Sequence, residues 1–304
     1  MRETKYLTSI LFFVSIFFFC STYSIADPWT TIDIPEGSYT HAYGIDGDNI
    51  VGHYLGPSGW SGFLYDGTRW TSLNAPEARS TYANGIDSIN IVGYFDDYAS
   101  GKNHGFLYNG STWTLLDAPE AIHTYAYGIF GSNIVGEYWD GSFSHGFLYD
   151  GSTWQILDMP GSNHTTAYDI DGFNIVGQYY DTSGYFHGFL FNGTTYATLD
   201  MPGAINTCAL GINGGNIVGF YNDSSGYLHS FLYNGSTWTT LDKSGAIMTY
   251  TQDIDGINIV GHYSDASGSH GFIYTIPEPV TLLFLGLGGL ILRRRAKYCL
   301  TKSR

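Results

Sequence analysis

The sequence predicts an all-β chain folded as a six-bladed β-propeller with four strands in each blade. First, the tetrapeptide Asn-Ile-Val-Gly occurs six times, at steps of 41, 43, 41, 42 and 42 residues. Second, each copy carries Gly-Phe-Leu-Tyr or a close variant. Repeats of this length that hold four short strands are typical of propeller blades. The first motif begins at Asn49, Asn90, Asn133, Asn174, Asn216 and Asn258, and the second at Gly62, Gly105, Gly146, Gly188, Ser230 and Gly271.

Four short strands are expected in each copy, and in the third copy they cover residues 125–129, 133–138, 146–149 and 154–158. The apolar runs are rich in Ile, Val, Phe and Tyr, and no helical period interrupts them. The first and third joints are tight, as at Asp150-Gly151, because Gly adopts positive φ at no steric cost. The second joint and the joint between copies are longer and polar. We therefore expect these longer loops on one face of the disc.

The two ends of the repeat region complement one another. The segment Trp29–Asp33 resembles a fourth strand that has no first three strands before it, and the last copy stops after its third strand, at Tyr274. We predict that the N-terminal strand pairs with Gly271–Tyr274, completes the sixth blade and closes the ring. Residues 27–275 would then form one domain.

Residues 1–26 have the pattern of a secretory signal peptide. Two basic residues precede an apolar run over residues 7–19, and Ser24-Ile25-Ala26 supplies a small-x-small cleavage site ending at Ala26. A lipoprotein signal through Cys20 is the alternative, which the bulky Phe18 and Phe19 disfavour. We expect the chain to be exported.

Residues 276–304 contain Pro277-Glu278-Pro279, an apolar stretch over residues 280–292 and the basic run Arg293, Arg294 and Arg295. This order closely resembles the PEP-CTERM sorting signal of bacterial surface proteins. As a helix the stretch would be about 20 Å long against a hydrocarbon core of about 30 Å, so it would anchor the chain only marginally. The resemblance implies that an exosortase-type peptidase recognises the Pro-Glu-Pro motif and releases the protein to the cell surface or extracellular matrix. A permanent tail anchor is the alternative.

The repeats also resemble the extracellular HAF repeat family, in which His-Ala-Phe-Leu follows a strand carrying Ile-Val-Gly. This chain has Gly in place of Ala, as in His104-Gly105-Phe106, and Ser61 where the first copy should have His. The resemblance implies a secreted propeller and says little about chemistry.

Charge restricts the partners. Residues 27–276 hold four basic and 25 acidic side chains, a formal charge of −21. Nucleic acid and anionic lipid are poor partners for such a surface, because their binding needs Lys and Arg. Neutral glycans and cations fit better, and membrane contact is expected only through the C-terminal segment before processing.

Only Cys208 lies in the repeats, so we expect no internal disulfide. We also expect a monomer.

Repeated polar residues have structural interpretations. A histidine precedes the third strand in five copies, but third strands lie about 15 Å from the axis, so these side chains cannot meet at one metal ion. We expect each to bond within its blade, for instance His145 with the loop residue Asp140, and we expect no cofactor, although calcium stays open. The five are His104, His145, His187, His229 and His270.

A threonine in the first strand recurs in every copy, and we expect its hydroxyl to satisfy nearby backbone groups while a small residue two positions later lets the blades approach. The Asn-Gly-Ser and Asn-Gly-Thr triplets at Asn109, Asn192 and Asn234 match glycosylation sequons, but we interpret them as hairpin turns. The threonines are Thr40, Thr81, Thr124, Thr165, Thr207 and Thr249.

The longer loops carry aromatic side chains beside aspartates, a mixture that sugar-binding surfaces use. Packing between blades is the alternative role for these aromatics. The candidate binding residues are Trp60, Tyr98, Trp139, Asp140, Asp181, Tyr185, Asp223, Tyr227 and Asp265.

We therefore expect a non-catalytic bacterial surface protein that binds extracellular polysaccharide or another envelope or matrix component through these loops. The alternative is a secreted propeller enzyme, a glycan hydrolase or lyase, and a purely structural role is the third hypothesis. An enzyme site should break the symmetry of the repeat with a base or carboxylates that the other copies lack. No copy shows this in the sequence, and no Gly-x-Ser-x-Gly motif occurs, so no catalytic residue is assigned.

Overall fold

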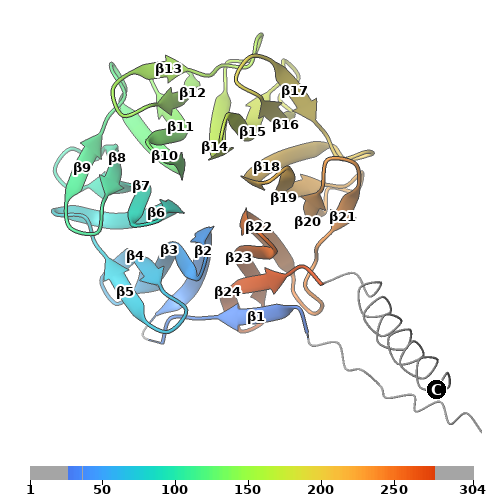
Figure 1. Ribbon diagram of the computed structural model, residues 1–304, viewed down its shortest axis with the longest axis horizontal. Helices are drawn as coiled ribbons and strands as arrows, with labels where there is room; N and C mark the ends of the chain where they lie inside the picture. The colour runs from blue at the N-terminus through green and yellow to red at the C-terminus, as the bar shows by residue number, and fades with distance from the viewer. Residues whose placement is uncertain (1–26, 36, 278–304) are drawn as a thin grey trace, which may run out of the picture.

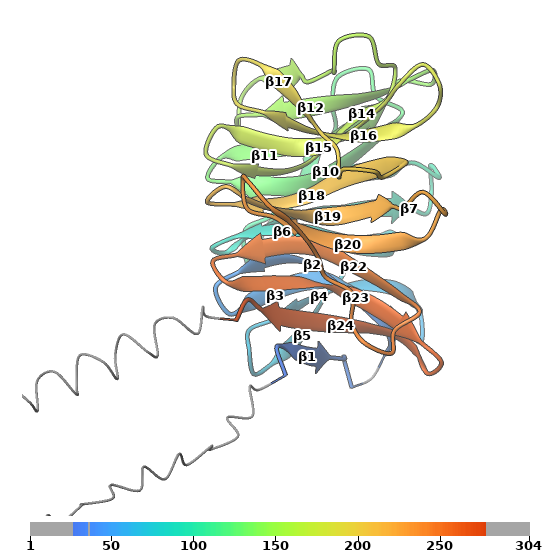
Figure 2. The same ribbon diagram turned by 90° about the vertical axis from the view of Figure 1, so that its right-hand side faces the viewer.

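The computed structural model describes residues 27–35 and 37–277, and it confirms the predicted ring of six antiparallel four-stranded sheets around a central axis (Figure 1). Edge-on, the strands run between the two faces of a disc (Figure 2). The predicted cleavage residue Ala26 and most of the predicted sorting signal (Glu278, Pro279, the apolar stretch and Arg293 to Arg295) lie outside the described residues. Within those residues no helix has the length and apolar character needed to cross a membrane.

Each blade runs outward from the axis in chain order. Blade 1 contains β2 (Ser38–Asp46), β3 (Asn49–Gly56), β4 (Gly59–Tyr65) and β5 (Trp70–Leu73). Blade 2 contains β6 (Ala78–Asp87), β7 (Asn90–Asp97), β8 (Asn103–Tyr108) and β9 (Trp113–Leu116). Blade 3 contains β10 (His123–Phe130), β11 (Asn133–Trp139), β12 (Ser144–Tyr149) and β13 (Trp154–Ile156).

The remaining blades repeat this order until the last. Blade 4 contains β14 (Thr165–Asp171), β15 (Asn174–Tyr180), β16 (Phe186–Phe191) and β17 (Tyr196–Leu199). Blade 5 contains β18 (Asn206–Asn213), β19 (Asn216–Asn222), β20 (Leu228–Tyr233) and β21 (Trp238–Thr240). Blade 6 contains β22 (Met248–Asp255), β23 (Asn258–Asp265), β24 (Gly268–Thr275) and, as its outer strand, β1 (Trp29–Ile32).

The ring closes as predicted. Strand β1 pairs antiparallel with β24, with Trp29 opposite Tyr274 and Ile32 opposite Gly271. The backbone N–H of Thr275 also donates to the carbonyl of Pro28 at 2.9 Å. Both ends of the described chain therefore lie side by side at blade 6.

The glycine of Asn-Ile-Val-Gly is fixed by close packing inside each blade. A Cβ on Gly136 would lie 2.0 Å from the carbonyl oxygen of Tyr125 and 2.7 Å from Cζ of Phe147. The first strand bulges beside this glycine, between Ala126 and Gly128, and the phenylalanine ring of the second motif covers it. Any side chain there would push the inner strands apart.

The hydrophobic core lies between neighbouring blades. Val92 of blade 2, for instance, packs with Ala126, Ile134 and Phe147 of blade 3. The small first-strand residue is fully buried in all copies, which confirms that it lets blades approach. The buried residues are Ala42, Ala83, Ala126, Ala167, Ala209 and Thr251.

The recurring threonine fastens the loop that enters each blade. Its buried hydroxyl accepts a hydrogen bond from a backbone N–H six residues earlier, as in Ala118 to Thr124 at 3.1 Å, and this confirms the predicted role. The same bond joins Ile34 to Thr40, Ala75 to Thr81, Met159 to Thr165, Met201 to Thr207 and Lys243 to Thr249.

The sequon asparagines are turn residues, since Asn109 Oδ1 accepts from the backbone of Ser111 and Thr112, and Asn192 and Asn234 do the same in their turns.

Candidate functional site

The disc has two unlike faces. We call the side with the tight hairpins the turn face, and the side with the longer loops within and between blades the loop face. The cavities that lie along the ring axis between the two faces are here called the axial channel. Because neighbouring strands are antiparallel, the joint between the second and third strands of each blade lies on the same side as the joints between blades, as predicted. In blades 1 and 6, however, the joint between the second and third strands is shorter than predicted and covers only residues 57–58 and 266–267.

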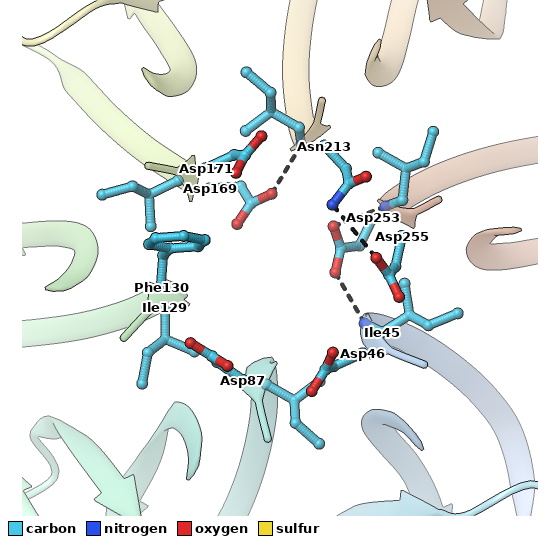
Figure 3. Close-up of a pocket in the computed structure, with 14 residues that line it drawn as sticks. Ile45, Asp46, Asp87, Ile129, Phe130, Asp169, Asp171, Asn213, Asp253 and Asp255 are labelled. Atoms are coloured by element: carbon cyan, nitrogen blue, oxygen red, sulfur yellow. Dashed lines mark hydrogen bonds between the residues drawn. The ribbon is translucent and has the colours of Figure 1, made fainter. Parts of the chain in front are cut away.

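At the turn face the channel ends in a cavity of about 250 Å³ that is ringed by carboxylates (Figure 3). Each carboxylate accepts a hydrogen bond from a backbone N–H in the next blade: Asp46 from Ser88 at 2.6 Å, Asp171 from Gly214 at 2.8 Å and Asp255 from Gly47 at 2.8 Å. Asp87 accepts from Gly131 and Asn213 from Gly256 in the same way. Phe130 takes this place in blade 3. The ring therefore ties successive blades together.

Two further carboxyls point into the centre of this cavity, those of Asp169 and Asp253 (Figure 3). Asp169 accepts from the N–H of Ile212 at 2.8 Å and Asp253 from that of Ile45 at 2.9 Å. Burial raises the pKa of Asp169 well above its usual range, and it raises the pKa of Asp253 to about 7. The other blades have glycine here. Sequence reasoning missed this break in symmetry, although a first-strand alignment of the copies would have found it.

Nearer the loop face, neutral and aromatic side chains line a channel cavity of about 420 Å³. Among them, His53 and His262 are buried, and the Nδ1 atom of each has no hydrogen-bond partner in the described part of the chain. His41 stacks on His262 with ring centroids 4.1 Å apart. Burial lowers the pKa of His41 to about 4 and that of His53 to about 3, so this cluster is neutral at pH 7.

The five repeated histidines each lie between two aspartates. His145 Nδ1 donates to Asp158 at 2.7 Å, while its Nε2 lies 3.4 Å from Asp140. The closer partner, an aspartate one or two residues after the fourth strand, was missed because the sequence analysis compared the histidines only with loop residues. In the other blades the closer partners are Asp117 for His104, Asp200 for His187, Asp242 for His229 and Asp33 for His270. Within the described residues no group of three or more such side chains is arranged to hold a metal ion.

The candidate loop aspartates also cap their own turns. Asp140 Oδ1 accepts from the N–H groups of Ser142 and Phe143 at 2.7 and 2.9 Å, and these bonds hold its pKa below the usual range. Asp181, Asp223 and Asp265 make equivalent bonds in their loops. Most of the hydrogen-bonding capacity of these carboxylates is therefore used within the loops.

The candidate aromatics divide into two sets. Tyr98, Tyr185 and Tyr227 project from the loops, with 81%, 49% and 70% of their surface exposed. Trp139 stacks on His123 at 5.6 Å, and Trp60 meets His53 edge-on at 5.1 Å. Of these five candidate aromatics, the three tyrosines are freely exposed, while the two tryptophans are partly covered by histidines.

Two cavities open on the loop face between adjacent blades. One, of about 380 Å³, lies between blades 6 and 1 and includes Asp33 and His270. The other, of about 360 Å³, lies between blades 1 and 2 and includes Trp60, Ser61 and Arg79. They occupy equivalent places in the repeat but differ in chemistry.

No protein-family model matches this chain, and no curated protein sequence matches it. Its structure is similar to that of SapL1 lectin in complex with alpha methyl fucoside, with a TM-score of 0.51 and 14% identity over 80% of this chain and 99% of the lectin chain. It is also similar to a triple arginine-to-alanine mutant of AofleA from Arthrobotrys oligospora (TM-score 0.52, 12% identity, 79% and 85% of the two chains). A third similar structure is the acylaminoacyl peptidase of Pyrococcus horikoshii (TM-score 0.52, 15% identity, 83% of this chain and 46% of the peptidase).

At these identities the likeness supports the class of fold alone, and the six four-stranded sheets of this chain make it a six-bladed β-propeller. The chemistry of this chain has to be inferred from its own residues.

Proposed function

We propose that this chain is a non-catalytic carbohydrate-binding propeller that contacts extracellular polysaccharide or another envelope component through its loop face. The observation that carries this proposal is the pair of loop-face cavities between blades, which place hydroxyl, amide and aromatic groups together. Such cavities suit a sugar ring, which offers hydroxyls at its edge and an apolar C–H face. The exposed Tyr98 and Tyr227 add stacking surfaces in the loops of blades 2 and 5.

The fold supports the same function. SapL1 lectin, which binds alpha methyl fucoside, is built on a similar ring of blades. The loop aspartates accept hydrogen bonds within their own loops. This argues against a catalytic loop face, because a glycosidase needs a carboxyl pair free to act on the sugar.

Glycan hydrolysis or cleavage by a lyase is the second candidate function, and one observation favours it. Asp253 and Asp169 are neighbouring carboxyls with raised pKa in the axial cavity, and a raised carboxyl pKa is typical of a general acid. Both accept backbone hydrogen bonds that fasten blades, which is the structural role we favour.

We also propose that the chain is exported and sorted as its termini suggest, by removal of residues 1–26 and recognition of the Pro277-Glu278-Pro279 motif by an exosortase-type peptidase. Supporting this, Pro28 and Thr275 are hydrogen-bonded neighbours, so trimming at both ends would cut no strand of the ring. The HAF-like repeats agree with a protein of the cell surface or matrix. Mass spectrometry of the protein from its host should lack both terminal segments; detection of Arg293 to Arg295 would favour the permanent anchor.

A glycan-array screen of the purified full-length chain, with and without calcium, tests the binding function. Retention of glycans without new reducing ends supports a binding protein, and release of shorter products would favour the enzyme. Failure to retain any glycan in either condition would overturn the proposal in favour of a structural role.

A further inference from the structure

We propose that the cavity between blades 1 and 2 is the principal sugar site, that it takes one neutral pyranose ring, and that the chain therefore binds one ligand per molecule although it has six repeats. This inference rests on the proposed carbohydrate-binding function. It follows from the residues by which blade 1 departs from the other blades.

Blade 1 lacks the histidine between two aspartates that each of the other five blades has. Ser61 stands where the other blades have histidine, and Asn74 stands where they have the aspartate after the fourth strand. Gly56, the last residue of the second strand, stands in place of the loop aspartate. All three substitutions replace an ionisable side chain with a neutral or absent one. The bulky imidazole and both carboxylates that occupy this place elsewhere are therefore missing from one blade.

The groups that replace the cluster have no protein partners. The side chains of Ser61, Asn74 and Arg79 make no hydrogen bond or ion pair with any residue in ranges 27–35 and 37–277. In the cavity between blades 6 and 1, by contrast, His270 bonds Asp33 at 2.8 Å. Ser269 in that cavity bonds His41 at 2.9 Å. Unpaired donors and acceptors that converge on one cavity are available to the hydroxyls of a ligand.

The cavity also has an indole as a stacking surface, which no other blade supplies at this position. The Trp60 indole lines it, and the edge-on contact with His53 holds the ring in place. The equivalent residues of the other blades are Asn103, Ser144, Phe186, Leu228 and Ser269. A rigid indole beside free polar groups matches a pyranose, whose C–H face packs on an aromatic ring while its hydroxyls bond the polar groups.

Among the residues that lie two positions before the recurring threonine, Arg79 is the one cation. Its equivalents are Ser38, Ile122, Asn163, Ile205 and Ile247. A guanidinium offers a fork of donors that fits two adjacent hydroxyls as well as a carboxylate. The carboxylate of Asp96 lies close enough for Arg79 to lower its pKa, against a larger rise from burial. Since that carboxylate and the charge of −21 on residues 27–276 would repel an anion, the geometry favours a neutral sugar.

Isothermal titration calorimetry of the full-length chain tests this inference. The probes are the methyl pyranosides of glucose, galactose, mannose and fucose, with methyl glucuronide as the charged probe. We expect one binding event per chain and a preference for a neutral probe. Arg79→Gln and Trp60→Ala should each weaken binding about tenfold or more, because each removes a direct contact. Arg69→Gln is the matched control, since Arg69 follows the tight turn between β4 and β5 on the opposite face, and it should bind as the wild type does.

A double variant, Ser61→His with Asn74→Asp, rebuilds in blade 1 the His–Asp pair that five blades already contain. It should fold with an unchanged melting temperature and bind more weakly, because the new histidine and aspartate bond each other, as His270 and Asp33 do, and no longer offer free groups to the sugar. Binding of five or six sugars per chain, tighter binding of the glucuronide, or full affinity in Arg79→Gln and in the double variant would overturn the inference. Those results would leave carbohydrate binding itself intact, whereas absence of binding to every probe and to the glycan array would overturn the proposed function as well.

Discussion

His270 donates a hydrogen bond from Nδ1 to the carboxylate of Asp33 at 2.8 Å, although 237 residues separate the two in sequence. In blades 2 to 5 the equivalent pair is only 13 residues apart, as in His145 and Asp158. The N-terminal strand therefore reproduces in blade 6 both the backbone pairing and the side-chain pair of an uninterrupted repeat. Ring closure extends to the level of individual side chains.

Ile32 is the buried anchor of this closing strand, with 7% of its surface exposed. Ile32→Ala should lower the free energy of unfolding by about 2–4 kcal/mol, because it leaves a cavity between blades 6 and 1. Exposed Thr30 on the same strand is the control, and Thr30→Ala should change stability by about 0.5 kcal/mol or less. Urea unfolding followed by tryptophan fluorescence measures both, and equal stabilities of the two variants would contradict the closing role of β1.

Gly136→Ala should be more damaging than any loop substitution in the same blade. The added methyl would overlap the carbonyl oxygen of Tyr125 and the ring of Phe147, so we expect a loss of about 3 kcal/mol or more. Ser132→Ala, in the exposed turn before β11, should stay within about 0.5 kcal/mol of the wild type. Thermal unfolding compares them, and a melting temperature of Gly136→Ala close to that of Ser132→Ala would show that the inner strands adjust easily.

The fold was predictable because each blade repeats the same local pattern. The Asn-Ile-Val-Gly spacing gave the number of blades, and the unmatched Trp29–Asp33 segment gave the closure. The recurring threonines were assigned correctly because a buried hydroxyl next to a loop has few alternatives to a backbone partner.

The side-chain clusters were less predictable because they depend on departures from the repeat. The contact of His41 with His262 joins the first and last blades, and periodicity within one copy carries no information about it. Asp169 and Asp253 lie next to the first-strand bulge, which changes the face on which a residue lies and so defeats a simple alternation rule. The bonds of Asp158 and its equivalents to histidine were not predicted, because the histidine partner lies on the preceding strand.

The axial histidines should make the protein sensitive to acid. Burial lowers the pKa of His53 to about 3 in the folded chain, whereas in the unfolded chain this histidine is protonated as the pH falls below about 6.5. Between these pH values the unfolded chain therefore binds a proton that the folded chain does not bind. Stability from this group is therefore present above pH 6.5 and falls as the pH drops toward 4. The double variant with His53→Gln and His262→Gln should lose less stability over this range than the wild type. Blade 4 already has glutamine, Gln178, at the equivalent position. Denaturant unfolding at pH 7, 5.5 and 4.5 measures it.

His145→Gln is the control for that experiment, because the pKa of His145 is raised. Burial opposes the shift, but the bonds to Asp158 and Asp140 outweigh it. The stability from this histidine is present below pH 6.5 and is lost as the pH rises through its folded pKa, which is the opposite sign. Its variant should therefore be more acid-sensitive than the wild type. Identical pH profiles for both variants would exclude the proposed origin of the acid response.

Asp253 should limit stability at alkaline pH. Burial raises its pKa from 3.8 to about 7, so its favourable protonated form is lost as the pH rises through 7. Asp253→Asn keeps an oxygen that can accept from the N–H of Ile45 and carries no charge. The variant should gain about 1 kcal/mol or more over the wild type at pH 9, and this gain should shrink at pH 5. Chemical denaturation at the two pH values tests this, and a gain that does not depend on pH would rule out ionisation as the cause.

A crystal structure of the full-length chain with the tightest-binding pyranoside tests the central claim most directly. The account predicts a single sugar on the loop face between blades 1 and 2, with its ring on Trp60 and its hydroxyls at Asn74 and Arg79. Sugar bound on the turn face, or equally in all the blade interfaces, would contradict it.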